Sequence, residues 1–522
     1  MRINALLIAL LLSTVAWTAP HEVWVNAGWT GQANCGGHTW MADAFPTIAG
    51  ALHTVEPGGT VTVAPGRYNG QIIIEKSVYL RGPGAGINPN ASVDADPFAA
   101  NPQRGIAEAI IMPAQTSLSI NDGMLITIKA DRVMVDGFML DGDNPDLKNG
   151  VQLNGIDGNA AGGIGNAEGY VQEIIISNNI LRNFAHSAIY FRNKNGNAPL
   201  VNQNIIANNR IDNLPLNQAV LYPTDYPMED CVGIFTDRVM FEITGNTVTR
   251  ALVGICIRGI WHGVPMFSPV LTHNRLDCAI SGISCNMISD QNVRGNVSST
   301  PPRLLIAQNS IRITPLQNIK LLCTGMSLCS IEHNSKLYLC DNVISGGDAG
   351  VFVWNAKSMN AGNIHLYGGI ISNAKNGVWL SNYYSLLPYP NEPTAVVLKG
   401  VVIRNSTQAG LYLLDDARGD VEVKATIMGG TVFQGGPVGI LVEGGGTRIS
   451  FVSDGKPSAE FMGQTEYFIE LNGNGKTYPP SFDTTTVRFE GRTLKDMTPD
   501  ERAKLERKLR DHHVDPRLGR LY

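Results

Sequence analysis

The feature that most constrains this 522-residue chain is a short pattern that recurs roughly every 27 to 37 residues. Each copy consists of an apolar run, an Asn or Gly at a turn, and a second apolar run. The copies lie at residues 174–184, 205–214, 242–251, 270–279, 305–314, 337–346, 365–374 and 396–405. Self-similarity at a period of roughly 20 to 50 residues is typical of repeat folds, in which each unit buries its apolar face against the next.

A second pattern follows each turn. It is a strand in which apolar residues alternate with residues of other types. Its copies lie at residues 187–192, 232–237, 253–258, 281–286, 349–354, 376–381, 409–414 and 438–443. Alternation along a strand places Ile234 and Thr236 on one face and their neighbours on the other. The pattern therefore predicts an all-β solenoid of stacked coils, in which one set of residues fills the core and the other faces outward.

Both open ends of such a stack need covers, and the sequence offers a short helix for each. Residues 46–55 have helical spacing of Ile48, Leu52 and Val55, which predicts a plug before the first coil. Residues 498–513 begin with a capping box and a proline at the first helical position, which predicts a charged capping helix. The expected division is a signal peptide at 1–19, an N-terminal cap and first coil at 20–86, the β-helix at 87–490, and a C-terminal charged helix and tail at 491–522.

The N-terminal segment and the composition indicate an exported, soluble protein. A positive start, the apolar run Leu6 to Leu12 and small residues after it are typical of a signal peptide, and no later run approaches the roughly 20 apolar residues of a membrane span. We therefore expect a secreted or periplasmic location. The 56 glycines and only 16% charged residues favour one repeat domain, and the net charge of -5 gives no reason to expect a nucleic-acid partner. The oligomeric state stays open.

Eight cysteines in an exported chain permit disulfides, but several lie where a small inward-facing residue belongs. They are Cys35, Cys231, Cys256, Cys278, Cys285, Cys323, Cys329 and Cys340. Bridges and buried thiols are both open interpretations. The Asp-rich turn at Asp141, Asp143 and Asp146 resembles a loose Ca²⁺ loop, but such turns are usually only turns. We therefore predict no metal site and no cofactor.

The segment 58–74, with sequence GGTVTVAPGRYNGQIII, precedes KSVYLRGPGAG at 76–86 and then the Asn-turn coils. This arrangement resembles the pectate-lyase-like superfamily over roughly residues 45–450. The resemblance implies a single-stranded right-handed parallel β-helix with short capping helices at both ends. That superfamily includes polysaccharide lyases, polygalacturonase-type hydrolases, alginate epimerases and non-enzymatic carbohydrate-binding proteins. The resemblance therefore implies a polysaccharide partner without fixing a reaction.

One stretch also resembles the catalytic pattern of the polygalacturonases. MEDCVGIFTD at 228–237 is similar to their paired acids before a C-V-x-I strand, which places Glu229 and Asp230 at the acid positions. The histidine of the following G-H-G element is missing, because Leu252 to Gly254 stands there. The D-P-H-D signature of the alginate epimerases is missing too. We therefore transfer no complete catalytic mechanism from either group to this chain.

The outward positions of the second pattern define a cationic zone in the earlier coils. It contains Arg192, Lys194, Asp237, Arg238, Arg258 and His262. Stacked coils lie about 4.8 Å apart, so these groups would converge within reach of one or two sugar rings. Lys194 and Arg258 could neutralise a uronate carboxylate and assist proton abstraction, as in a lyase. Asp237 with Glu229 or Asp230 could instead supply the two carboxylates of a glycoside hydrolase. The alternative is that the residues of the cationic zone are solvated charges on an outward face.

Aromatic residues occupy the outward positions of the later coils, at Trp354, Trp379, Tyr383 and Tyr412. Their ring faces suit the apolar faces of sugars, whereas the long insertion 381–393 could cover them instead. In the coil between the two zones we expect Ser330 and Glu332 to face outward. A lyase, a hydrolase and a non-catalytic glycan-binding surface protein therefore remain three hypotheses.

Overall fold

The computed structural model describes most of the chain. The described residues are 19–91, 104–153, 155–166, 169–194, 204–216, 231–261, 270–289, 303–317, 321–331, 335–354, 364–382, 394–415, 422–444, 447–472, 486–506 and 508–511. The predicted signal peptide therefore lies almost entirely outside them. Within the described ranges, no helix combines the length and apolar character needed to cross a bilayer.

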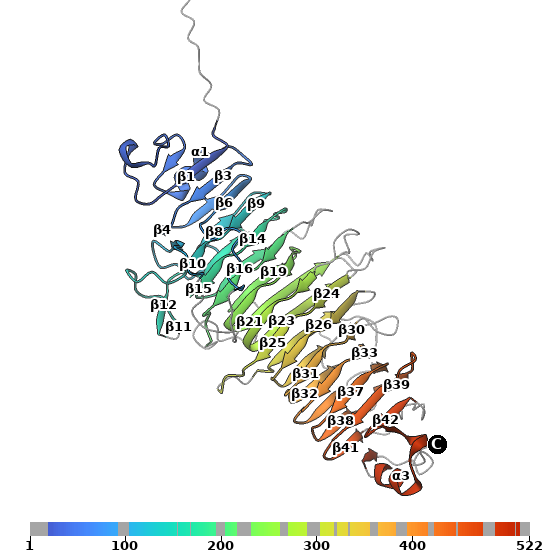
Figure 1. Ribbon diagram of the computed structural model, residues 1–522. Helices are drawn as coiled ribbons and strands as arrows, with labels where there is room; N and C mark the ends of the chain where they lie inside the picture. Colours follow the sequence, from blue (N-terminus) through green and yellow to red (C-terminus); the bar gives the residue numbers. More distant parts are fainter. Residues whose placement is uncertain are drawn as a thin grey trace, which may run out of the picture.

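Three stacks of parallel strands run along one elongated column, with the N-terminal coils at one end and the C-terminal coils at the other (Figure 1). The first stack contains β2 (Ala44–Phe45), β1 (Glu22–Val25), β3 (Thr60–Val63), β6 (Val78–Arg81), β9 (Val133–Asp136), β14 (Ile175–Ser177), β17 (Ile205–Ala207), β20 (Glu242–Thr244), β22 (Val270–Thr272), β24 (Arg303–Ala307), β27 (Lys336–Cys340), β30 (Ile364–Tyr367), β33 (Thr394–Lys399), β36 (Val423–Met428) and β39 (Thr447–Val452). Each strand pairs in parallel with the equivalent strand of the next coil, for example β14 with β17. The predicted parallel β-helix is therefore confirmed.

The second and third stacks share two long strands, β21 (Thr247–Trp261) and β23 (Arg275–Ser289). The second stack also contains β4 (Gly66–Asn69), β7 (Ala109–Met112), β10 (Met139–Asp141), β15 (Ile180–Arg182), β18 (Arg210–Asp212), β25 (Ser310–Ile313), β28 (Val343–Ser345), β31 (Ile370–Ser372), β34 (Val402–Arg404), β37 (Thr431–Gln434), β40 (Ala459–Met462) and β42 (Val487–Phe489). The third contains β5 (Ile72–Ile74), β8 (Met124–Ile128), β13 (Gly162–Asn166), β16 (Ser187–Arg192), β19 (Val232–Asp237), β26 (Thr324–Ile331), β29 (Ala349–Trp354), β32 (Asn376–Ser381), β35 (Ala409–Leu414), β38 (Val438–Glu443), β41 (Tyr467–Asn472) and β44 (Leu509–Asp511). Antiparallel additions are the hairpin β11 (Val151–Leu153) with β12 (Ile156–Gly158), and β43 (Arg492–Thr493) against β42.

The inward positions form one continuous apolar core along the column. In the third stack, Ile189 is in register with Ile234, which is in register with Ile255 and then Ile283. All four side chains are fully buried. Burying one such side chain contributes about 1.5–3 kcal/mol, so the stacking of coils supplies the stability that no single coil could reach.

A ladder of buried asparagines lies at the turn between the first and second stacks. Its members are Asn179, Asn209, Asn246, Asn274, Asn309 and Asn342. The main-chain N–H of Asn209 donates to Oδ1 of Asn246 at 2.9 Å, and its Nδ2 donates to the same atom at 3.0 Å and to the Ile176 carbonyl at 2.9 Å. Each rung thus satisfies the backbone of its own coil and the amide of the coil before it.

The residue before each ladder asparagine takes the left-handed conformation. Asn178 has φ 53° and Asn208 has φ 56°, while Gly245 fills the equivalent position with φ 65°. Asn and Gly tolerate this region at little cost. Two successive residues at this turn therefore have separate functions: the first bends the chain, and the second forms hydrogen bonds between the coils.

The two ends differ from each other in how they are closed. The helix α1 (Ile48–Thr54) buries Ile48 and Leu52, and its N-cap Thr47 accepts a hydrogen bond from the Gly50 N–H at 3.2 Å. At the other end, the helix α3 (Pro499–Glu506) is shorter than expected, because residues 509–511 form β44 and pair with β41. The prediction of one helix over 498–513 is therefore wrong in its second half. The short 3-10 helices η1 (Gln32–Asn34) and η2 (Leu494–Asp496) complete the described structure at the two ends.

Replacing the central rung in Asn246→Ala should destabilise the fold by about 3 kcal/mol, because it leaves buried donors and acceptors of both neighbouring coils without partners. Denaturant unfolding followed by circular dichroism measures the change. Asn69→Ala, at an exposed position of β4, is the matched control and should lie within about 0.5 kcal/mol of the wild type. Equal effects of the two variants would show that the ladder does not stabilise the coils.

Candidate functional site

The outer face of the third stack carries two columns of side chains, one residue per coil. The first column is Tyr190, Phe235, Cys256, Ser284, Ser327, Phe352, Trp379, Tyr412, Leu441 and Glu470. The second is Arg192, Asp237, Arg258, Asn286, Cys329, Trp354, Ser381, Leu414, Glu443 and Asn472. Neighbouring members are about 4.8 Å apart along the column axis. The cationic and aromatic zones therefore lie on one face, in line with each other.

Asp237 lies between two arginines, since Arg192 on β16 and Arg258 on β21 are its register partners in the coils on either side. Oδ2 of Asp237 is 3.2 Å from Nε of Arg192, and Oδ1 is 3.6 Å from Nε of Arg238. Only 1% of Asp237 is exposed. We call Arg192, Asp237, Arg238 and Arg258 the arginine cluster.

The turn after β19 and the backbone of β21 at Gly259 hold this cluster in place. Arg238 has φ 58°, and its main-chain N–H donates to the Arg258 carbonyl at 3.0 Å. Gly259 has φ 68°, and a Cβ added there would lie 2.7 Å from Oδ1 of Asp237. Glycine is therefore required at 259 both for its backbone angle and for the close approach of the carboxylate.

Burial shifts the pKa of both Asp237 and Arg258 toward the uncharged form. Burial raises the pKa of Asp237 above its ordinary value of 3.8, and the positive charges of Arg238 and Arg192 only partly oppose the rise. Burial, together with the like charge of Arg192, lowers the pKa of Arg258 below its ordinary value of 12.5. Asp237 thus holds its proton more tightly, and Arg258 less tightly, than the same side chain does in water.

The first column beside the arginine cluster is covered by apolar contacts. The rings of Tyr190 and Phe235 stack with centroids 4.8 Å apart, and Phe235 and Cys256 are buried at 0% and 2% exposure. Leu216 and Leu316, from segments that follow strands of the second stack, pack against this group. Along these coils the face is therefore closed over the first column, and the polar groups lie at its edge.

The remaining members of the predicted cationic zone fall into two groups. Lys194 is exposed just beyond β16, and its carbonyl accepts a hydrogen bond from Nη1 of Arg238 at 3.4 Å. The structure thus brings Lys194 to the arginine cluster. Glu229, Asp230 and His262 lie outside the described residues.

The aromatic zone is a run of tilted rings on successive coils. The ring centroids of Phe352 and Trp379 are 5.0 Å apart with an interplanar angle of 59°, and those of Trp379 and Tyr412 are 5.3 Å apart at 35°. Trp354 and Trp379 are half-buried, whereas Tyr412 is only 7% exposed and donates to Oε2 of Glu443 at 2.5 Å. The two tryptophans are therefore partly accessible, and Tyr412 packs against Trp379 from the next coil. Tyr383, the remaining predicted member of this zone, lies outside the described residues.

The coil between the two zones corrects one expectation. Ser327 is in register with Ser284, and Cys329 with Asn286, so these two residues occupy the outward positions for which Ser330 was expected. Glu332 lies outside the described residues. The correct frame is visible in the sequence, because Thr324 to Cys329 repeats the pattern of small residue, Gly, apolar, polar, apolar. Glu443 was also left out of the predicted site, although its place in the second column follows from the same frame.

The cysteines and the Asp-rich turn take part in the packing and the hydrogen bonding of the fold. All eight cysteines are free thiols, and seven of them are buried. Asp141 accepts hydrogen bonds from Nε of Arg182 at 2.8 Å and from Nδ2 of Asn183 at 2.7 Å. In the described part of the chain, no cluster of three or more His, Cys, Asp or Glu side chains is placed to hold a metal ion.

The chain matches no protein-family model and no curated protein. Among solved structures, it is similar to the A-module of the mannuronan C-5 epimerase AlgE4 of Azotobacter vinelandii, with 13% identity and a TM-score of 0.35 over 80% of this chain and 91% of that one. The catalytic domain of a GH87 α-1,3-glucanase has 10% identity and a TM-score of 0.39, over 85% and 65% of the two chains. The periplasmic alginate epimerase AlgG has 12% identity and a TM-score of 0.36, over 80% and 79%. At these identities and TM-scores none of the three assigns a role to a residue of this chain, so the roles of individual residues depend on the chain's own contacts.

The raised pKa of Asp237 gives the site a testable pH dependence. A carboxyl with a higher pKa in the folded than in the unfolded chain adds stability in acid, and this contribution is lost as the pH rises from about 3.8 through the folded value. Asp237→Asn mimics the neutral acid, so the wild type should lose stability relative to this variant between pH 4 and pH 7. Denaturant unfolding of both proteins at the two pH values measures the difference. A wild type that gains stability relative to Asp237→Asn over this interval would show that the arginines outweigh burial.

Proposed function

We propose that this chain is an exported protein that binds an acidic polysaccharide along the outer face of the third stack and cleaves it by β-elimination at the arginine cluster. The observation that carries the proposal is the register of Arg192, Asp237 and Arg258 on successive coils, in line with Trp354. A linear polymer can follow such a face because each coil offers one more contact at a constant spacing. The signal-peptide pattern of the N-terminal segment supports export.

The cluster has a surplus of positive charge suited to a uronate. Three arginines surround one carboxylate, and Lys194 lies beside them. A guanidinium binds a carboxylate through paired hydrogen bonds, and the fixed Asp237 limits the orientations that Arg192 and Arg238 can take. Neutralising the uronate carboxylate lowers the cost of removing the proton from the adjacent carbon.

The proposed reaction needs one base and one proton donor. A base removes the proton on the carbon next to the carboxylate, the C–H electrons form a C=C bond, and the bond to the leaving oxygen breaks. That oxygen takes up a proton. Arg258 suits the role of base because its pKa is lowered, and Lys194 suits that of donor because it is exposed at the edge of the cluster.

Hydrolysis through Asp237 has less support. The carboxylate is 1% exposed and bound by Arg192, so a nucleophile or a general acid at this position would first have to leave its ion pair. Asp237 therefore fits better as a positioning residue for the arginines. The tests below follow both unsaturated product and reducing ends, so that hydrolysis would be detected.

Arg258→Ala and Lys194→Ala should each lower the rate of unsaturated-product formation on a uronate polymer by about 100-fold or more, because each removes a group that contacts the reacting unit. Ultraviolet absorbance of the double bond measures the rate, after a panel of acidic and neutral polysaccharides has identified a substrate. The matched controls are Arg303→Ala and Lys336→Ala, exposed neighbours on the first stack, which should keep full activity.

Two results would contradict the proposed reaction. Reducing ends without double-bond absorbance would indicate a hydrolase. Saturable binding of the polymer with no product of either kind would indicate a glycan-binding surface protein.

Trp354→Ala should weaken binding of the same polymer by about 10-fold while leaving the wild-type fold intact, since a half-buried ring offers its face to a sugar. Calorimetric titration with an uncleaved oligosaccharide measures the change. Tyr338→Ala is the control, because Tyr338 is a half-buried aromatic residue on the first stack. Equal losses in both variants would place the binding surface elsewhere.

A further inference from the structure

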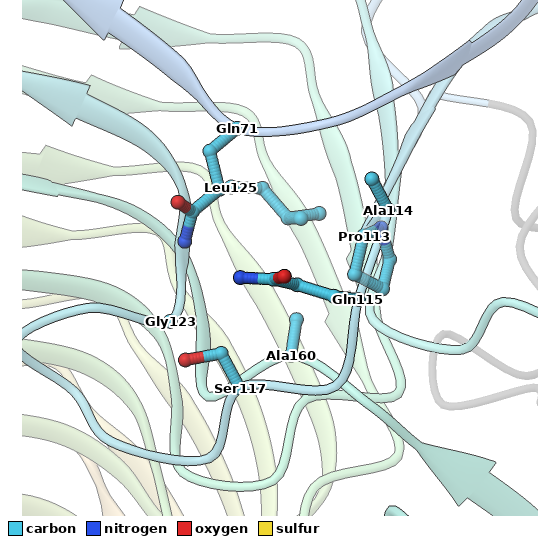
Figure 2. A pocket seen from close by; sticks show the side chains of 8 residues that line it. All are labelled: Gln71, Pro113, Ala114, Gln115, Ser117, Gly123, Leu125 and Ala160. Atoms are coloured by element: carbon cyan, nitrogen blue, oxygen red, sulfur yellow. The ribbon is translucent and has the colours of Figure 1, made fainter. Parts of the chain in front are cut away.

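A separate cavity lies among the N-terminal coils, away from the arginine cluster. Its volume is about 230 Å³, and it is lined by Gln71, Pro113, Ala114, Gln115, Ser117, Gly123, Leu125 and Ala160 (Figure 2). The amide group of Gln115 points into this space, and the amide of Gln71 lies at its edge, where Nε2 donates to the Asp122 carbonyl. Pro113, Ala114, Leu125 and Ala160 supply apolar surface around these polar groups.

The segment that forms this cavity is held by bonds to the coils beneath it. The Ser117 N–H donates to the Asn159 carbonyl at 2.8 Å, and the Ser117 carbonyl accepts from the Ala161 N–H at 2.9 Å. Nδ2 of Asn144 donates to the Pro113 carbonyl at 2.7 Å. A Cβ at Gly123 would lie 2.3 Å from the Ser117 carbonyl oxygen, so this position must be glycine for the segment to pack. The cavity is therefore preformed.

The chemistry of the lining selects an uncharged ligand rich in hydroxyl groups. Among the described residues that line the cavity, none is ionisable. Primary amides and a hydroxyl can each donate and accept hydrogen bonds, which suits alcohol groups, while the apolar side suits the C–H face of a ring. The volume is below the roughly 300 Å³ at which pockets begin to hold drug-sized ligands, so one ring is the appropriate size.

The cavity also lies on the stack that carries the proposed groove. Leu125 belongs to β8 and Ala160 precedes β13, and β13 pairs with β16, which carries Arg192. The distance from β8 to β16 along the axis is two coil steps, or about 10 Å. Met124, next to Leu125, belongs to the same apolar group as Tyr190. Leu125 and Ala160 themselves belong to the inner core, so the cavity lies between that core and the exposed Ala114 and Gln115, two coil steps from β16.

We propose that this cavity is a subsite for one neutral sugar ring of the polysaccharide, a unit at its end or on a branch. The proposal rests on the proposed function for the identity of the polymer, and it makes the site selective for glycans that carry an uncharged unit near their uronates. Gln115 and Oε1 of Gln71 bind the hydroxyl groups, and Pro113 and Ala114 contact the ring face.

The test is calorimetric or ligand-observed NMR titration with the methyl glycosides of glucose, galactose, mannose and N-acetylglucosamine. At least one should bind the wild-type protein saturably and without dependence on salt concentration. Ala114→Trp, at an exposed position on the rim, should weaken that binding by about 10-fold or more, and Gln115→Leu by about 5- to 10-fold through the loss of hydrogen bonds. The matched controls are Ala503→Trp on α3 and Gln434→Leu on β37, both at exposed positions.

The result is separable from that of the proposed function. Arg258→Ala should keep the binding of the methyl glycoside while it loses activity on the polymer. Failure of all four glycosides to bind the wild type would overturn the subsite, as would binding that survives Ala114→Trp unchanged. Methyl glucuronide binding more tightly than its neutral counterpart would also contradict it, since the lining carries no charge to favour an anion.

Discussion

The register between successive coils is the constraint on which the rest of this structure depends, and the asparagine ladder holds it. In each rung the side-chain Oδ1 accepts both the backbone N–H and the side-chain amide of the coil before, as Asn274 does for Asn246. A coil that slipped by one residue would lose these bonds and would turn its core residues outward. The same register decides which side chains meet on the outer face, so Asp237 lies between Arg192 and Arg258 because the coils cannot slide.

The arginine cluster places charged groups in a partly buried and therefore electrostatically unfavourable arrangement, which the rest of the fold tolerates. Burial opposes the charge of Asp237 and that of Arg258, and the like charge of Arg192 adds to the cost at Arg258. The strained turn at Arg238 and the glycine at 259 add to the cost. A stack whose core is continuous and apolar can carry such a local cost, since the other coils stabilise one another independently of it.

The part of the structure that follows from period-two alternation could be predicted from sequence. Ile234 faces the core and Asp237 faces outward because both follow from one strand pattern, and the same frame applied to each coil gives the two outer columns. The coil at β26 shows that the frame must be set from the whole repeat, since Thr324 to Cys329 repeats the pattern of the other coils while Ser327, Cys329 and Met326 taken singly do not fix it. The packing of Leu216 and Leu316 against the group around Phe235 could not be predicted from the local sequence. Both residues come from segments whose paths depend on the finished coils. The C-terminal segment formed β44 for the same reason: pairing with β41 outweighed its helical propensity.

Two faces of the column carry aromatic residues, and their ring geometries are similar. On the first stack, the rings of Tyr338 and His365 are nearly parallel, with centroids 5.1 Å apart and an interplanar angle of 17°, and Tyr367 is tilted against both. On the third stack, Trp379 is tilted against Phe352 by 59° and against Tyr412 by 35°, while Trp354 is nearly parallel to Phe352 at 18°. The third stack is distinguished by its arginines, because Arg192 and Arg258 share a column with Trp354. The proposed polysaccharide site is assigned to this stack because it combines aromatic surface with positive charge.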